Sequence, residues 1–502
     1  MAVTRRHLAL FLAAVLACGT VATAGAVPAA AAPPVCDTPT PSTTQPGYLV
    51  ADPDCDPGGT PFVALADASG APSSRVYTGI REGAAWRVEV PLRWNGDLVV
   101  YAHGYRGTGT TVYVDNPALR AHYIAEGFAW AASSYSTNGY DVGQGVRDSY
   151  PLIDQFRRVT GRPARSVYMT GASMGGQITA VAVEKHPRAF VAAMPYCGVL
   201  GDTELYDFFL DANVTAAALA GVPVDFPLQP PAGYPDRWRA RVARILPALG
   251  VTAGAPPALT AAGRTWSDVV ERRSGGERPG FDGAFAYWNA ARSLAPLNDL
   301  PFLFGLYPGL SGGTGGIADG NVTDNRFTVY RSTDRWWPTP AEWRLNAEVL
   351  RVRHTAEASR GLDGIPRVNG RPSVPVLSLH DIGDLFVPLS MEQVYARRAA
   401  ANGKSRLFVS RAIRGVGHCD FTAPELQQGF DDLVTWVRDG RRPAGDAILD
   451  RRAVAAPAFG CRWTVGVRPA FAAQPCPAVS APATPAGART RPGSSPSRPA
   501  AR

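Results

Sequence analysis

Two stretches of the chain alternate continuous apolar runs with segments of helical spacing. In the first, the run DLVVYAHG at 97–104 is almost wholly apolar, as expected of a strand buried on both faces of a sheet. The segment at 117–127 instead spaces its apolar residues as a helix does. Repetition of this order predicts an α/β fold with a mostly parallel central sheet and helices on both faces. The predicted strands lie at 86–92, 97–104, 128–136, 166–171 and 189–198, and the predicted helices at 117–127, 143–161 and 175–187.

This alternation stops after residue 198 and resumes near residue 373. The residues between, 199–370, contain many Pro and Gly, several Trp and short segments of helical character. We interpret them as a large inserted cap over the edge at which the parallel strands end. A separate domain is the less favoured alternative, because the sheet pattern continues afterwards. It continues with strands at 373–381 and 405–413 and helices at about 389–401 and 424–438.

The predicted core therefore comprises residues 86–198 and 371–476. Residues 33–85 precede it and are rich in Pro, Asp, Gly and Thr. We expect this segment to form an irregular lead-in that is held by Cys36 and Cys55.

Both ends of the chain have the composition of segments outside a folded domain. Residues 1–32 begin with Arg5 and Arg6, continue with an apolar run and end in small residues, which is typical of a secretory signal cleaved near Ala32. The paired arginines also fit a twin-arginine export signal. A membrane anchor is disfavoured, because the apolar run is short and rich in alanine. Residues 477–502, rich in Pro, Ala, Ser and Arg, are expected to be a disordered tail.

The net charge of +8 is concentrated in these two ends of the chain. Two arginines of the leader and four of the tail account for most of it, so the remainder does not favour a nucleic-acid partner. None of the seven histidines belongs to a Cys/His cluster with zinc spacing, and neither a metal nor another cofactor is predicted. A cleaved export signal without a stable membrane anchor predicts a secreted protein.

The chain has seven cysteines, of which Cys18 lies in the predicted leader. The even number that remains suggests three disulfides in an exported protein. Proximity along the chain favours two local pairs and leaves a third: Cys36–Cys55, Cys461–Cys476 and Cys197–Cys419. Cys197 lies at the end of a predicted strand and Cys419 in a loop that follows another, so we hypothesise a disulfide at the edge of the sheet that restrains the loop around Cys419.

The segment GASMGG at 171–176 has the form Gly-x-Ser-x-Gly, with Ser173 between Gly171 and Gly175. A predicted strand precedes it and a predicted helix follows, which is the context of a nucleophile elbow. Glycines let neighbouring backbone pass close to such a turn, and a helix N-terminus favours negative charge beside the serine. The alternative is an ordinary strand-to-helix turn in which Ser173 only caps the helix.

Three further loops follow predicted strands and carry reactive groups. They are HGYRG at 103–107, HDIGDLFVP at 380–388 and GVGHCDF at 415–421. Because parallel strands end at one crevice, these loops are expected to meet Ser173. A serine hydroxyl needs a base to take its proton, and the base needs a carboxylate to orient it. The order Ser, Asp, His along the chain matches an α/β-hydrolase.

On these four motifs the chain resembles a secreted α/β-hydrolase of the serine esterase and lipase kind. The resemblance covers about 86–198 and 373–440 and leaves the cap unmatched. The His-Cys pair of the last loop is also similar to the tannase and feruloyl-esterase group, in which a cysteine beside the serine pairs with one beside the histidine. Here Ala172 precedes Ser173, so the chain departs from that pattern.

The resemblance implies a catalytic triad. Ser173 would be the nucleophile, His418 the general base and Asp384 the acid that orients His418. Asp381 is the competing acid, but the Val-Pro that follows Asp384 has the spacing usual after such acids. Asp420 is expected to be structural. The alternative for His418 is a histidine that only packs in the core.

The same resemblance implies an oxyanion hole. The backbone N–H groups of Met174 and Tyr105 would bind the negative oxygen of the tetrahedral intermediate. His103 is expected to orient the backbone of its loop rather than to take part in the chemistry.

The predicted activity is hydrolysis of carboxylic esters, small or polymeric, through an acyl-serine intermediate. A serine peptidase of the aminopeptidase type would use the same triad, but the acidic pocket it requires is not evident in the sequence. A non-catalytic binding protein on a hydrolase scaffold is a third hypothesis, and haloperoxidase or lyase chemistry a smaller one. Tryptophans of the cap would either roof the acyl or aryl group or pack the cap core: Trp266, Trp288, Trp336, Trp337 and Trp343.

Overall fold

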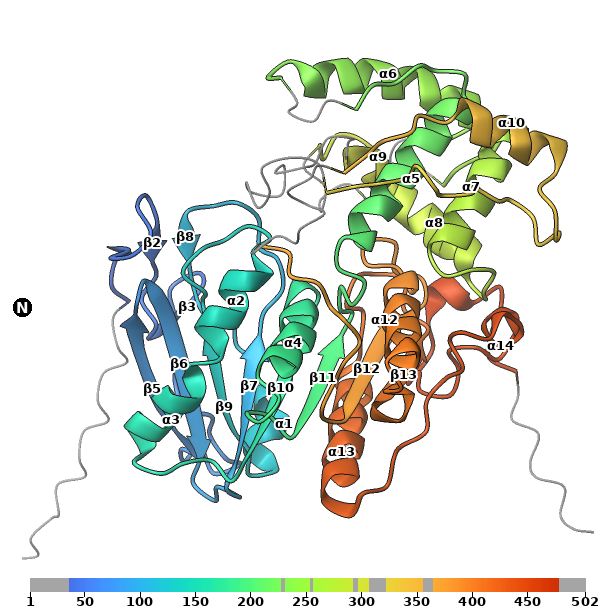
Figure 1. The fold of residues 1–502 in the computed structure, drawn as a ribbon. Coiled ribbons are helices and arrows are strands. Elements are labelled where there is room, and N and C mark those ends of the chain that lie inside the picture. Colours follow the sequence, from blue (N-terminus) through green and yellow to red (C-terminus); the bar gives the residue numbers. More distant parts are fainter. Residues whose placement is uncertain are drawn as a thin grey trace, which may run out of the picture. The chain divides into compact units, whose positions relative to one another are not determined.

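An eight-stranded sheet forms the centre of the fold (Figure 1). The computed structural model describes residues 36–226, 231–252, 256–291, 297–306, 322–354 and 364–477. The predicted leader at 1–32 and the predicted tail beyond Pro477 lie outside the described residues. Of the described helices, none combines the length and apolar character that crossing a bilayer requires.

The strands lie side by side in the order β5-β6-β9-β7-β10-β11-β12-β13. β5 and β6 are antiparallel, as are β6 and β9, and every later pair is parallel. The mostly parallel sheet that the apolar runs predicted is thus confirmed. Its strands are β5 (Ser74–Arg81), β6 (Ala84–Pro91), β7 (Asp97–Ala102), β9 (Ala129–Ser133), β10 (Ser166–Ala172), β11 (Ala192–Tyr196), β12 (Val376–Asp381) and β13 (Phe408–Ile413).

The sheet begins earlier than the sequence predicted, because β5 lies within the segment expected to be irregular. Most residues of β5 are only half-buried, so this edge strand lacks the strong apolar run of the central strands. Its Gly79 faces the indole of Trp86 so closely that a Cβ there would approach a ring carbon to 2.6 Å. The rest of the lead-in contains short strands only: β1 (Thr40–Pro41), β2 (Leu49–Val50), β3 (Cys55–Asp56) and β4 (Thr60–Pro61), with β8 (Thr111–Val112) pairing to β2.

Helices cover both faces of the sheet. Along β7, Leu98 and Val100 belong to one apolar cluster, and Val99 and Tyr101 to another, as the period of two in a strand requires. Side chains of α2 (Val142–Ser149), α3 (Leu152–Thr160), α4 (Met174–Lys185) and α12 (Ser390–Ala401) complete the first cluster. Those of α1 (Arg120–Ala125) and α13 (Ala423–Asp439) complete the second. The predicted helix 143–161 is divided near Pro151, which caps α3.

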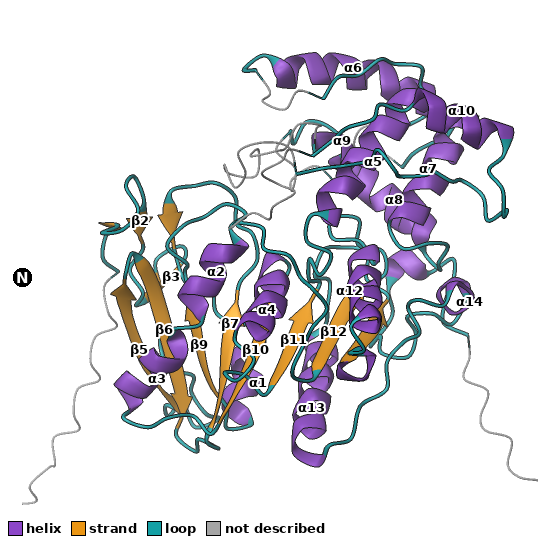
Figure 2. Cartoon of the chain, in the orientation of Figure 1, coloured by secondary structure: helices purple, strands orange, loops and turns teal. Residues whose placement is uncertain are grey.

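A helical insertion connects β11 to β12 (Figure 2). Its described helices are α5 (Glu204–Leu219), α6 (Tyr234–Leu249), α7 (Ala261–Arg273), α8 (Phe281–Ala290), α9 (Phe302–Gly305) and α10 (Pro340–Glu348). A 3-10 turn at Ser405–Leu407 precedes β13. After α13 the chain forms α14 (Arg451–Ala455) and a second 3-10 turn at Pro469–Phe471. The insertion contacts the core through Trp288, whose indole N–H lies 3.0 Å from the Gly383 carbonyl and 2.8 Å from that of Val416. It therefore touches both loops that were predicted to carry the triad acid and base.

Candidate active site

Ser173 stands in a sharp turn between β10 and α4. Its φ and ψ are 57° and −121°, a backbone conformation that non-glycine residues rarely adopt. A Cβ at Gly171 would lie 2.2 Å from the Gly175 carbonyl oxygen, and one at Gly175 would lie 2.1 Å from that of Ala102. Both glycines of the motif are therefore required by close backbone packing, and the strained turn has the geometry of a nucleophile elbow.

Three loops bring Ser173, His418 and Asp384 into one hydrogen-bonded chain. His418 Nε2 lies 2.7 Å from Ser173 Oγ, and His418 Nδ1 lies 2.6 Å from Asp384 Oδ2. The other oxygen of Asp384 accepts hydrogen bonds from the N–H groups of Phe386 at 2.8 Å and Val387 at 3.0 Å. Asp384 is fully buried, whereas His418 and Ser173 are partly exposed. The arrangement has the geometry that a nucleophile, a base and an orienting acid require.

The fold is that of an α/β-hydrolase. If the strands of the large sheet are numbered one to eight along the chain, their order across the sheet is 1-2-4-3-5-6-7-8. The turn at Ser173 follows the fifth of these strands, β10. Asp384 follows β12 and His418 follows β13, so each of these residues follows a strand that the sequence predicted.

The competing acid, Asp381, is placed differently. Its Oδ2 accepts the backbone N–H of Asp420 at 2.8 Å, and its Oδ1 has no hydrogen-bond partner among the described residues. Burial raises the pKa of Asp381 well above its ordinary value, and the nearby Asp384 raises it further. Asp420 makes a 3.4 Å ion pair with Arg468. Asp381 and Asp420 thus support the histidine loop and make no hydrogen bond to His418 in the described structure.

The two predicted oxyanion donors lie on either side of the elbow. Met174 is the first residue of α4, where backbone N–H groups have no partner inside the helix. Tyr105 follows Gly104, and a Cβ on Gly104 would lie 3.1 Å from Ser173 Cβ. Neither amide donates a hydrogen bond within the part of the chain that the structure describes. Both are therefore available to a ligand at Ser173.

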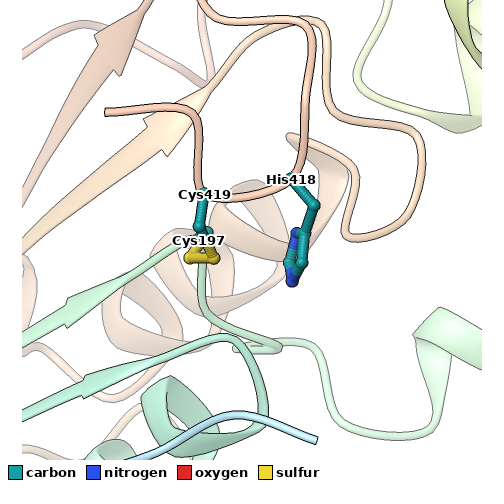
Figure 3. A group of neighbouring side chains, drawn as sticks. All are labelled: Cys197, His418 and Cys419. Carbon is teal, nitrogen blue, oxygen red and sulfur yellow. A yellow bond between two sulfur atoms is a disulfide. The ribbon is translucent and has the colours of Figure 1, made fainter. Parts of the chain in front are cut away.

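A disulfide joins Cys197, at the end of β11, to Cys419, which adjoins His418 (Figure 3). The predicted pair is confirmed, as are the local pairs Cys36–Cys55 and Cys461–Cys476. The partner of Cys419 therefore comes from the residue that follows the neighbouring strand β11, and not from position 172. Cys197 and Cys419 have φ values of 45° and 57°, so the bond links two strained turns. Their sulfurs lie near the ring of His418, but bonded to each other they offer no thiolate to a metal.

Removing the disulfide beside His418 is expected to reduce turnover. In a Cys197→Ser/Cys419→Ser variant the two turns can relax, and displacement of His418 by about 1 Å would lower kcat roughly 10- to 100-fold. The matched Cys36→Ser/Cys55→Ser variant removes a bond in the lead-in and should keep kcat near wild type. Ester-hydrolysis kinetics of both variants check this. An equal fall of kcat in the two variants would contradict it.

A cluster of aromatic rings lies beside His418. The Phe386 ring lies 4.9 Å from that of His418 and also contacts Phe209 and Phe302 of the insertion at 6.3 and 5.1 Å. The region beside His418 is therefore apolar, which strengthens the polar interactions within it.

Of the five cap tryptophans, Trp266 and Trp288 are fully buried and pack the core of the insertion. The other three, Trp336, Trp337 and Trp343, are 87%, 73% and 60% exposed. Trp266 and Trp288 thus fit the alternative in which the tryptophans pack the cap core, and the ring that lies against His418 belongs to Phe386. Sequence reasoning missed Phe386, although it lies within the acid loop, because aromatic periodicity says nothing about contacts between distant loops.

No protein-family model matches the chain. A curated protein described as o-phthalyl amidase, from Xanthobacter agilis, is 35% identical over 77 residues, which cover 15% of this chain and 17% of that protein. The chain thus matches less than a fifth of that relative's length.

Solved structures resemble the chain at low sequence identity. Feruloyl esterase B from Aspergillus oryzae is 15% identical with a TM-score of 0.41, covering 78% of this chain and 84% of that one. Tannin acyl hydrolase from Aspergillus niger is 13% identical with a TM-score of 0.41, covering 74% and 79%. The rice cell wall degrading esterase LipA from Xanthomonas oryzae is 13% identical with a TM-score of 0.33, covering 72% and 88%.

Proposed function

We propose that the chain is a serine hydrolase that cleaves carboxylic esters through an acyl-serine intermediate. The observation that carries this proposal is the continuous hydrogen-bonded chain from Ser173 through His418 to Asp384, with distances of 2.7 and 2.6 Å. Nucleophile and base are within the reach that proton transfer requires, and the base is oriented by a buried carboxylate.

The reaction has two steps. His418 Nε2 takes the hydroxyl proton as Ser173 Oγ attacks the ester carbonyl, and the oxyanion is bound by the amides of Met174 and Tyr105. His418 then gives the proton to the leaving alcohol as the C–O bond breaks. Water attacks the acyl-serine in the same way, its proton passing through His418 back to Ser173 Oγ, and the free acid leaves.

Amide hydrolysis is a second candidate, which the match to a protein described as an amidase favours. The triad is common to both reactions, so the substrate must decide between them.

Secretion is part of the proposal as well. It is supported by the leader-like first 32 residues and by three disulfides, which persist in oxidising compartments.

The deciding experiment compares matched esters and amides. Initial rates are measured on p-nitrophenyl esters from acetate to palmitate and on p-nitroanilides of the same acids. A fluorophosphonate probe is then mapped by mass spectrometry. Ester rates well above anilide rates, with the probe on Ser173, are expected, and the chain-length profile sizes the acyl pocket. Preference for anilides would favour the amidase, and no turnover with no label would favour a non-catalytic binder.

A further inference from the structure

The loop that carries Tyr105 is held by a buried histidine and an arginine. His103 Nδ1 lies 2.7 Å from the Gly104 carbonyl oxygen, and its ring stacks on Tyr135 at 3.9 Å. On the other side of the ring, Arg106 Nη2 lies 2.6 Å from His103 Nε2. The His103 side chain is thus enclosed between the backbone of its own loop and a guanidinium.

Arg106 is itself fixed by several acceptors. Its Nη2 also donates to the Ser134 carbonyl at 3.0 Å, and its Nη1 donates to the Tyr113 carbonyl at 2.6 Å. The guanidinium lies 3.9 Å over the Tyr113 ring and 3.4 Å from Asp115. The cation therefore has little freedom to leave His103.

This contact decides which nitrogen of His103 carries the proton. A guanidinium has donors only, so His103 Nε2 must accept, and the proton of the neutral ring must lie on Nδ1. From Nδ1 it is donated to the Gly104 carbonyl. Burial and the charge of Arg106 lower the pKa of His103 well below its ordinary value, which keeps the ring neutral. Without Arg106, the Nε2–H tautomer of His103 could donate to the Ser134 carbonyl, which lies 3.2 Å from Nε2.

The direction of the Gly104 carbonyl fixes the direction of the next amide. In a trans peptide the C=O of Gly104 and the N–H of Tyr105 point to opposite sides. Because the carbonyl is turned toward His103, the N–H is turned away from it. In the opposite tautomer, the lone pair of His103 Nδ1 would face the lone pairs of the Gly104 oxygen and drive this peptide out of position.

We infer that Arg106 is a positioning residue: it selects the Nδ1–H tautomer of His103 and thereby holds the Tyr105 amide in place as an oxyanion donor. The role of the amide rests on the proposed function, whereas the tautomer does not. The sequence contained the signal, since Arg106 lies within the motif HGYRG, but its contact with His103 depends on the fold of the loop.

The test removes the donors of Arg106 and keeps the length of its side chain. In Arg106→Met, 15N-histidine NMR should show His103 change from the Nδ1–H to the Nε2–H tautomer. With p-nitrophenyl esters, kcat should fall about 100-fold with KM little changed, as for loss of one oxyanion donor. Arg106→Lys restores a cationic donor and should recover the Nδ1–H tautomer and much of kcat. The control is Arg162→Met, which removes a guanidinium stacked 5.1 Å from the Trp94 ring.

Circular dichroism of each variant verifies folding. If Arg106→Met is unfolded, the tautomer of His103 is measured in Arg106→Lys instead. An unchanged tautomer in folded Arg106→Met overturns the inference. So does a changed tautomer with unchanged kcat, because the ring would then not govern the oxyanion donor. Absence of Ser173-dependent turnover in the wild type would refute the proposed function and the role of the Tyr105 amide, while the NMR arm still decides the contact between Arg106 and His103.

Discussion

Ser173→Ala is expected to lower kcat on esters by about five to six orders of magnitude, because the acyl-enzyme cannot form. The residual rate would come from the oxyanion donors and substrate binding alone. The variant should remain folded, since the only hydrogen bond of Ser173 Oγ that the structure describes is to His418. Progress curves with purified protein, titrated for active sites in the wild type, measure the ratio. A variant retaining a tenth of wild-type kcat would exclude Ser173 as the nucleophile.

The control for this variant is Ser166→Ala, at the start of the same strand, which should keep wild-type kcat. A second comparison tests whether the residues act as one unit. When Ser173→Ala is combined with His418→Ala, the rate should fall little below that of Ser173→Ala alone, because triad effects are far from additive. A further large fall would mean that His418 acts independently of Ser173.

The central strands could be predicted because they are buried on both faces. β7, β10 and β12 contain only short, nearly unbroken apolar runs, and each precedes a loop with a reactive residue. Since parallel strands end at one edge, this pattern placed the loops of Ser173 and Asp384 at the same edge of the sheet. β5 was missed, because half-burial at the sheet edge leaves no comparable pattern.

What the sequence could not show depends on contacts between distant segments. Phe386 contacts Phe209, which lies 177 positions earlier in the chain, and no periodicity in either segment indicates that contact. The buried Trp288 and the exposed Trp336 are also the same type of residue, and only their packing in the fold distinguishes them. The disulfide between Cys197 and Cys419 was predictable because the local pairs left those two cysteines over.

Asp384→Asn is expected to lower kcat by about four orders of magnitude without unfolding the protein. The N–H groups of Phe386 and Val387 donate to Oδ1 and will hold the amide oxygen of the asparagine there. Its NH2 group is then forced toward His418 Nδ1, which must accept. The ring proton moves to Nε2, facing Ser173, so His418 can no longer take the hydroxyl proton. Asp384→Asn therefore tests the tautomer of the base rather than the presence of a side chain.

The matched control is Asp381→Asn, three residues earlier and equally buried. Asp381 does not bond His418, so kcat should stay near wild type. Because the folded state raises the pKa of Asp381, its ionisation costs stability as the pH rises from the unfolded value of about 3.9 toward the raised folded value. Asparagine never ionises, so the urea midpoint of Asp381→Asn should increasingly exceed that of the wild type as the pH rises above about 4. Loss of kcat in Asp381→Asn with retention in Asp384→Asn would reverse the assignment of the triad acid.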